Sequence, residues 1–124
     1  VRWKGTPVST EIENLVRTFV DVYNAPGSDV YPQFADEVDL SEHSSGRGGG
    51  REELFSALRE LRAEWTELHL EIDQIIADED SAALVSSWTA RMPDGTQVAT
   101  SIVWILEFKD GLITKEHDYV LLKR

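Results

Sequence analysis

Asp118 is the strongest candidate for chemistry in this sequence of 124 residues. Residues 112–122 alternate as a β-strand does, which places Glu116 and Asp118 on one face and His117 on the other. If the first face lines an apolar cavity, burial raises the pKa of Asp118, and the carboxyl group becomes a usable general acid or base near neutral pH. The alternative is a solvated carboxylate near a sheet edge in an acidic chain.

His43 is the second catalytic candidate, because a histidine at a pocket mouth shuttles a proton at neutral pH or donates to a substrate oxygen. Residues 38–43 alternate as a short strand does, so Glu42 and His43 point to opposite faces. A register slip of one residue would place Glu42 in the pocket instead of His43. An exposed histidine is the competing interpretation.

Other classes of site find little support in the residue pattern. The three histidines, His43, His69 and His117, fall on different elements without metal-ligand spacing, and the chain has no cysteine. The glycine-rich residues 44–50 lack the Lys-Ser/Thr pair of a phosphate-binding loop, so we interpret them as a mobile loop or lid. No Gly-x-Ser-x-Gly nucleophile motif is present. We expect no metal and no cofactor.

Charge and hydropathy also limit the partners. With 12 basic against 23 acidic residues, the formal net charge is −11, which argues against binding to nucleic acid or to anionic lipid. No apolar run is long enough to span a bilayer, and the amino terminus lacks the apolar core of a signal peptide. The absence of cysteine fits a reducing compartment, and we expect a cytoplasmic protein.

The elements that must position these residues follow from hydrophobic periodicity. A capping box at Thr10 and Glu13 starts a helix with an apolar stripe that reaches Tyr23. Further elements are a short helix over 30–35, a strand over 38–43, a long helix from Arg51, and four strands over 68–77, 82–92, 97–109 and 112–122. Short turns make these last strands antiparallel neighbours. The pattern predicts an α+β fold with the helices on one face of a curved sheet.

The strand over 97–109 carries apolar residues on both faces, with Trp104 on one and Val103 and Ile105 on the other. The helices cover only one face, since all of them precede the last four strands. The second face needs another cover, and a second copy of the chain is its simplest source. We expect a homodimer through this outer sheet face, and we place Trp88 there.

Several segments together resemble the SnoaL-like domains of the NTF2-like superfamily. They are Gly50-Arg51-Glu52-Glu53-Leu54, the strand from Leu68 with its acidic turn, Ser87-Trp88-Thr89-Ala90, Phe108-Lys109-Asp110-Gly111-Leu112-Ile113, and Glu116-His117-Asp118-Tyr119. The resemblance implies a single domain over residues 1–124, with 1–9 as an extension. It implies a cystatin/NTF2-like cone, in which N-terminal helices pack on a curved, mainly antiparallel sheet that encloses an apolar pocket.

The resemblance also bears on the candidate site. In the SnoaL-type cyclases and limonene epoxide hydrolases, the last strand carries an aspartate into the pocket, and Asp118 stands at the matching place. The epoxide hydrolases add an Arg and an Asp on the strand before the Pro-x-Gly turn, where this chain has Val85 and Ser87, so epoxide hydrolysis is the less favoured reaction. Ketosteroid isomerases bring a carboxylate from the early region, which keeps Glu42 in reserve and Asp39 as a weaker reserve.

We expect the ligand to be a small apolar molecule. The residues predicted to bind it share a pocket-facing position or an aromatic side chain; they are Tyr23, Tyr31, Phe34, Trp65, Ser87, Thr100, Ile102, Trp104 and Glu116. The predicted function is cofactor-free proton transfer on an apolar carbonyl compound, as an isomerase or an aldol-type cyclase. The alternative is a non-catalytic ligand-binding or dimerisation module of the NTF2-like type.

Overall fold

The computed structural model describes residues 8–25, 27, 29–43 and 46–121, and for Val8, Ser9, Tyr31 and Arg47 it describes only the main chain. The elements follow the order α1 (Val8–Asn24), a 3-10 turn (Tyr31–Gln33), β1 (Phe34–Glu42), β2 (Arg47–Gly49), α2 (Arg51–Glu64), β3 (Thr66–Ala77), β4 (Ser81–Arg91), β5 (Gln97–Lys109) and β6 (Leu112–Leu121). The residues 1–7, part of the predicted N-terminal extension, lie outside the described residues.

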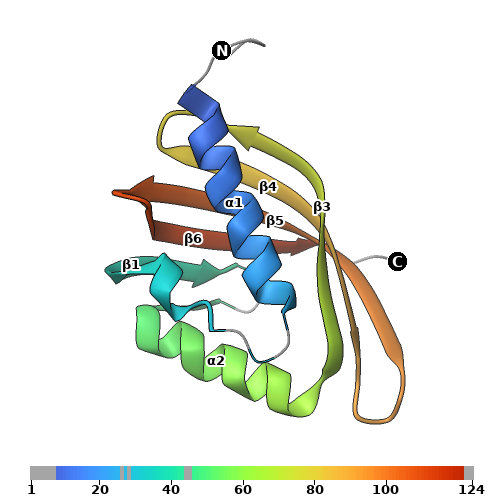
Figure 1. Cartoon of the computed structure of the whole chain (residues 1–124). Coiled ribbons are helices and arrows are strands. Elements are labelled where there is room, and N and C mark those ends of the chain that lie inside the picture. The colour runs from blue at the N-terminus through green and yellow to red at the C-terminus, as the bar shows by residue number, and fades with distance from the viewer. Residues whose placement is uncertain (1–7, 26, 28, 44–45, 122–124) are drawn as a thin grey trace.

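The strands form one six-stranded sheet in the order β2-β1-β6-β5-β4-β3 (Figure 1). β3 to β6 are an antiparallel series joined by short turns, as the sequence predicts. Asp110 and Gly111, between β5 and β6, both have positive φ (53° and 78°), the backbone that a tight hairpin turn requires. β1 pairs with β6 in parallel, so the sheet is mixed and the first strand lies beside the last.

The helix α1 crosses the concave face of the sheet (Figure 1). It buries the predicted stripe at spacings of three and four, which includes Ile12, Val16, Phe19 and Tyr23. At its end, Asn24 exchanges two hydrogen bonds of 2.7 Å with the main chain of Leu70, which ties the helix to β3. This anchoring holds the last turn of α1 beside the edge strand, with Tyr23 against Trp88 of β4 and Trp104 of β5.

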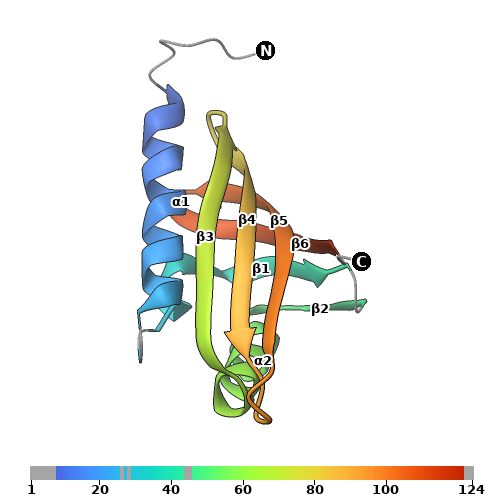
Figure 2. The same ribbon diagram turned by 90° about the vertical axis from the view of Figure 1, so that its right-hand side faces the viewer.

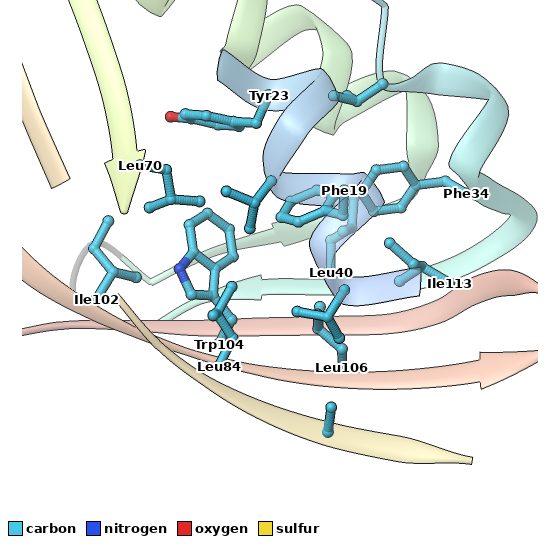
Figure 3. Packing of buried hydrophobic residues seen from close by; sticks show 14 of the residues in the cluster. Phe19, Tyr23, Phe34, Leu40, Leu70, Leu84, Ile102, Trp104, Leu106 and Ile113 are labelled. Carbon is cyan, nitrogen blue, oxygen red and sulfur yellow. The ribbon is translucent and has the colours of Figure 1, made fainter. Parts of the chain in front are cut away.

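The core lies between α1 and the inner face of β4 to β6. Figure 3 shows Phe19 and Tyr23 from the helix packed beside Trp104 from β5. The ring centroids of Phe19 and Tyr23 lie 5.7 and 6.3 Å from that of Trp104, in edge-to-face arrangements. On the opposite side of β3 to β5, the face toward the viewer in Figure 2 carries no helix among the described elements.

Three local predictions differ from the structure. α1 begins at Val8, so Thr10 lies inside the helix and is not its N-cap. The short helix predicted over 30–35 is a 3-10 turn, because Phe34 already belongs to β1. The loop predicted over 44–50 contains the strand β2, which pairs antiparallel with β1; Ser44 and Ser45 lie outside the described residues.

Candidate functional site

A cavity of about 620 Å³ opens between α1, α2 and the strands β1, β5 and β6. Its volume is in the range of pockets that hold drug-sized ligands. Its lining is mostly apolar or aromatic, with carboxylates concentrated on one wall. The lining residues are Phe19, Tyr23, Val30, Phe34, Leu40, Ser41, Glu42, Gly48, Glu53, Leu54, Ser56, Ala57, Leu58, Glu60, Leu61, Trp104, Glu116 and Asp118.

The carboxylate wall is made by β1 and β6. The parallel pairing sets Leu40 beside Glu116 and Glu42 beside Asp118, and side chains of paired residues lie on the same face. On the other side of β6, Asp118 pairs with Trp104 of β5. Three carboxylates, Glu42, Glu116 and Asp118, therefore share one wall of the cavity, next to the indole of Trp104.

Burial and mutual repulsion change how these groups hold protons. Burial is the largest cause that raises the pKa of Glu116 well above its usual value, and the hydrogen bond to Asp118 and the charges of Asp118 and Glu42 act in the same direction. Burial and the charge of Glu42 raise the pKa of Asp118, while the hydrogen bond from Glu116 and the nearby His43 and His117 act against this rise. The hydrogen bond between the two groups thus raises the pKa of Glu116 and lowers that of Asp118, so Glu116 is the member of the pair that holds its proton more tightly.

Glu116 is also an exception among the buried polar groups. Only 3% of the residue is exposed, and within the described part of the chain its Oε1 atom has no hydrogen-bond partner. A buried acceptor without a donor costs about 1–3 kcal/mol. Glu116 is one of the residues that line the cavity.

Tyr23 provides a hydroxyl group on the helix side of the cavity. The Trp88 Nε1–H donates to the Tyr23 Oη over 3.0 Å, and both residues are buried. Because the oxygen accepts this bond, the hydroxyl hydrogen remains available to an acceptor in the cavity. Burial is the main reason that the pKa of Tyr23 is raised, so the group stays a neutral hydrogen-bond donor at neutral pH.

A second indole is held by a similar chain of hydrogen bonds. The Trp104 Nε1–H donates to the Ser86 hydroxyl over 2.9 Å, and that hydroxyl donates to the Ile102 carbonyl over 2.7 Å. The buried Ser86 thus satisfies the indole and fixes the plane of the ring that lines the cavity.

The structure brings several predicted site residues to the cavity and leaves others outside it. Asp118, Glu116, Tyr23, Phe34 and Trp104 line the cavity. Four predicted residues do not line it: Trp65, Ser87, Thr100 and Ile102. The Trp65 ring lies 5.6 Å from that of Trp88, and Ile102 belongs to the core. The Thr100 hydroxyl donates to the Leu121 carbonyl. The side chain of Tyr31 lies outside the described residues.

The prediction that His43 faces the pocket differs from the structure. His43 follows β1 in the outward phase and is exposed, where its ring stacks on Tyr119 at 4.2 Å. Its Nε2 lies 3.2 Å from the Nδ1 of His117, whose Nε2 lies 3.0 Å from the Asp39 carboxylate. Asp39, the weaker reserve, is thus also on the outer face. Glu42, the reserve for a slipped register, lines the cavity.

The two faces of β4 are the reverse of the prediction: the face predicted to line the pocket is the outer one. Ser87 donates to the exposed Asp73 carboxylate over 2.7 Å on the outer face, and Val85 shares its phase. The outer position predicted for Trp88 is wrong, because the residue is 8% exposed and bonded to Tyr23 in the interior. Alternation could not settle the orientation, because both faces of this strand carry small or apolar residues.

One wall of the site is not predicted from the sequence, and Glu42 is predicted only as a reserve. The α2 wall of the cavity includes Leu54, Leu58 and Leu61, which the apolar stripe of that helix indicates only as core positions. The inward phase of Glu42 has a signal: Val38, Leu40 and Glu42 alternate on one face, and the first two are core residues.

The described part of the chain offers neither a metal centre nor a membrane-spanning helix. Among the described residues, no group of three His, Cys, Asp or Glu side chains is arranged to hold a metal ion. No described helix combines the length and apolar character that a membrane span requires.

The arrangement of the described helices on the six-stranded sheet defines the fold, because solved structures share it, and one of them is described as having a ketosteroid isomerase-like fold. A hypothetical protein of Catenulispora acidiphila, solved with trimethylamine, matches with a TM-score of 0.77 at 18% identity over 85% of this chain and 83% of its own. An LEH-like epoxide hydrolase of M. tuberculosis matches at 0.79 and 21% identity over 93% and 86%. A candidate SnoaL-like polyketide cyclase of Jannaschia sp. CCS1 matches at 0.81 and 16% identity over 96% and 91%.

Sequence comparison gives the family. The profile of the SnoaL-like domain matches residues 16–116, and the chain belongs to this family. A search of curated proteins finds no match for the chain. The structural likenesses, all at low identity, support the fold and leave the reaction open.

Proposed function

We propose that the protein is a cofactor-free proton-transfer enzyme, an isomerase or an aldol-type cyclase, that acts on a small carbonyl compound with a largely apolar body. The observation that carries the proposal is the hydrogen-bonded pair of Glu116 and Asp118 in the wall of an apolar cavity. A pair of carboxyl groups with unequal proton affinity supplies a base and an acid at the same place.

In the proposed reaction, the Asp118 carboxylate removes a proton from the carbon next to the substrate carbonyl. The C–H bond breaks, its electron pair moves toward the carbonyl oxygen, and an enolate forms. For isomerisation, Asp118 returns the proton at a different carbon. For cyclisation, the enolate carbon attacks a second carbonyl of the same molecule, a C–C bond forms as the carbonyl π bond breaks, and the resulting alkoxide takes the proton from Asp118. Glu116 keeps its proton and donates to Asp118, which orients the carboxylate.

The enolate oxygen needs a hydrogen-bond donor, and Tyr23 supplies it in this proposal. Its oxygen is fixed by the Trp88 indole, so its hydroxyl hydrogen points to the remaining acceptor, the substrate. Loss of such a donor costs about a hundredfold to a thousandfold in kcat. Tyr23 replaces His43 as the donor, because the His43 ring stacks on Tyr119 on the outer face.

The experiment is proton exchange in D₂O, followed by NMR for a panel of β,γ-unsaturated ketones and 1,3-diketones. The wild-type protein is expected to accelerate deuterium incorporation next to the carbonyl, and Asp118→Asn to lose most of this rate. Asp21→Asn, an exposed position on α1, is the matched control and should retain it. Equal rates for wild type and Asp118→Asn would overturn the proposal, as would a wild-type rate no faster than buffer across the panel.

A second candidate function is a ligand-binding module without catalysis. It is favoured by the Catenulispora acidiphila structure, which holds a small amine in the same fold. It predicts saturable binding of a ligand that Asp118→Asn weakens, with no proton exchange for any bound compound.

We also propose that the outer face of the sheet pairs two copies of the chain. Large apolar side chains stand exposed there: Ile76 of β3 is 57% exposed, and Leu121 and Tyr119 of β6 are 51% and 39% exposed. These residues lie on β3 and β6, on the face that no described helix covers. In a twofold dimer both copies use the same face, so the pairing needs no other partner surface.

A further inference from the structure

The last turn of α2 contacts Tyr23 through the side chain of Arg62. A guanidinium N–H of Arg62 donates to the Tyr23 main-chain carbonyl over 2.7 Å. The central carbon of the same guanidinium lies 5.6 Å from the centroid of the Tyr23 ring. One side chain therefore contacts both the main chain and the aromatic ring of the residue that donates to the enolate oxygen in the proposed reaction.

The main-chain bond fixes the end of α1. Carbonyl groups in the last turn of a helix have no partner within the helix, and Tyr23 is the residue before the last one of α1. Arg62 provides a donor to one of these carbonyl groups, while Asn24 is bonded to Leu70 of β3. Two neighbouring residues are thus tied to two different elements, α2 and β3, and the backbone that carries the Tyr23 ring is held by both.

The guanidinium also places a permanent positive charge near the Tyr23 phenol. The distance is within the range of cation–π attraction, and a nearby cation favours the charged form of a phenol. Burial is the largest cause that raises the pKa of Tyr23, and the charges of Glu116 and Asp118 act in the same direction. The hydrogen bond from Trp88 and the charge of Arg62 lower this pKa. Arg62 thus opposes the effect of burial on the phenol.

The charge of Arg62 matters most when the substrate becomes negative. A ketone oxygen carries little charge, whereas an enolate oxygen is an anion, and its hydrogen bond to a hydroxyl donor is stronger. As that bond strengthens, part of the negative charge passes to the Tyr23 oxygen, where the cation beside the ring stabilises it. The contact therefore favours the transition state over the bound ketone, which is the condition for an interaction to raise kcat.

We infer that Arg62 is a positioning residue, which holds Tyr23 through its main chain and strengthens the hydrogen bond from the Tyr23 hydroxyl to the substrate through the charge beside its ring. The inference rests on the proposed function, because it requires Tyr23 to donate to a substrate oxygen. Arg62 is not one of the described residues that line the cavity, so it acts through Tyr23 and does not touch the substrate.

Direct titration of Tyr23 tests the charge contact without any turnover. Tyr23 is replaced by 3,5-difluorotyrosine, whose phenol is more acidic than that of tyrosine, and fluorine NMR follows its ionisation over the pH range in which circular dichroism shows the native fold. Arg62→Gln and Arg62→Met remove the charge and are expected to lower the acid dissociation constant of this phenol about three- to tenfold. Arg62→Lys keeps the charge and should stay within about twofold of wild type, as should Arg59→Gln, at an exposed position one turn earlier in α2.

A double-mutant cycle tests whether Arg62 acts through Tyr23. In the deuterium-exchange assay of the proposed function, Arg62→Gln is expected to lower kcat at least about threefold, with a smaller change in KM, and Arg62→Lys to retain most of the rate. In the Tyr23→Phe background no hydroxyl remains, so Arg62→Gln should lower kcat by no more than about 1.5-fold. A merely structural role of Arg62 would give the same loss in both backgrounds.

The outcomes separate this inference from the proposed function. An unchanged Tyr23 dissociation constant in the neutral Arg62 variants, the same fall in Arg59→Gln, or an equal loss of kcat in both backgrounds would overturn the role of Arg62. Proton exchange by the wild type together with any of these results would retain the enzyme proposal. A lower Tyr23 dissociation constant in Arg62→Gln, without proton exchange by the wild type, would retain the charge contact and overturn the enzyme proposal.

Discussion

Replacement of Glu116 by Gln should make the protein more stable at neutral and alkaline pH, although it removes a buried hydrogen-bonding acid. The native protein holds the Glu116 proton more tightly than the unfolded chain does, because burial and the neighbouring Asp118 and Glu42 carboxylates raise the pKa of Glu116 well above 4.5. A glutamine has nearly the same shape as the protonated acid, and its amide donates to Asp118 in the same way.

The magnitude follows from proton linkage. Where the native state binds one proton more than the unfolded state, the free energy of unfolding falls by about 1.4 kcal/mol per pH unit. For Glu116 the fall in the free energy of unfolding begins as pH rises above 4.5, the pKa of the group in the unfolded chain, and ends at its raised pKa in the native protein. The stabilising contribution of the group is therefore fully present in acid and is lost as pH rises through that window. The glutamine variant lacks this loss.

The assay is urea denaturation of wild type and Glu116→Gln at half-unit steps of pH, with protein concentration held constant so that association does not change the result. The difference in unfolding free energy should grow by about 1.4 kcal/mol per pH unit in favour of the variant and then become constant. Glu71→Gln, on the outer face of β3, should follow the wild-type curve. If the Glu116→Gln curve also runs parallel to wild type, Glu116 ionises as a solvated residue does and the burial argument is wrong.

Two further predictions concern the hydrogen bond behind the cavity and the outer sheet face. Trp88→Phe removes the N–H that donates to Tyr23 Oη, so we expect the free energy of unfolding to fall by about 1–3 kcal/mol, as measured by chemical denaturation. Trp65→Phe, which changes the less buried ring beside Trp88, should lower the free energy of unfolding by less. An equal loss for both variants would contradict the role given to the bond. By sedimentation, the wild-type protein should have the mass of two chains, and Ile76→Lys combined with Leu121→Lys should give one chain with unchanged far-UV circular dichroism. A wild-type monomer at micromolar concentration would show that this face is not an interface.

The site could be predicted from the sequence wherever local alternation carried the information. From Lys115 onward the phase of β6 is clear, because Glu116 is buried while Lys115 and His117 are turned outward, and the alternation of residue types sets Glu116 and Asp118 on one face. Ile113 is also buried but lies in the opposite phase, on the other side of a register shift that alternation does not predict. The stripe of α1 likewise placed Tyr23, since a helix with one apolar face has only one way to pack on a sheet. The antiparallel order of β3 to β6 followed from turns too short for any crossover.

Periodicity and turn residues alone predict the two long helices, the antiparallel order of β3 to β6 and the acidic pair of the last strand. Tertiary packing sets Glu42 beside this pair, because β1 and β6 lie far apart in the chain and no turn sets their register. It also decided that Trp88 faces inward to hold Tyr23, since β4 carries small or apolar residues on both faces and alternation alone leaves its orientation open. Local periodicity is set by backbone geometry, whereas these two contacts depend on which distant surface each strand packs against.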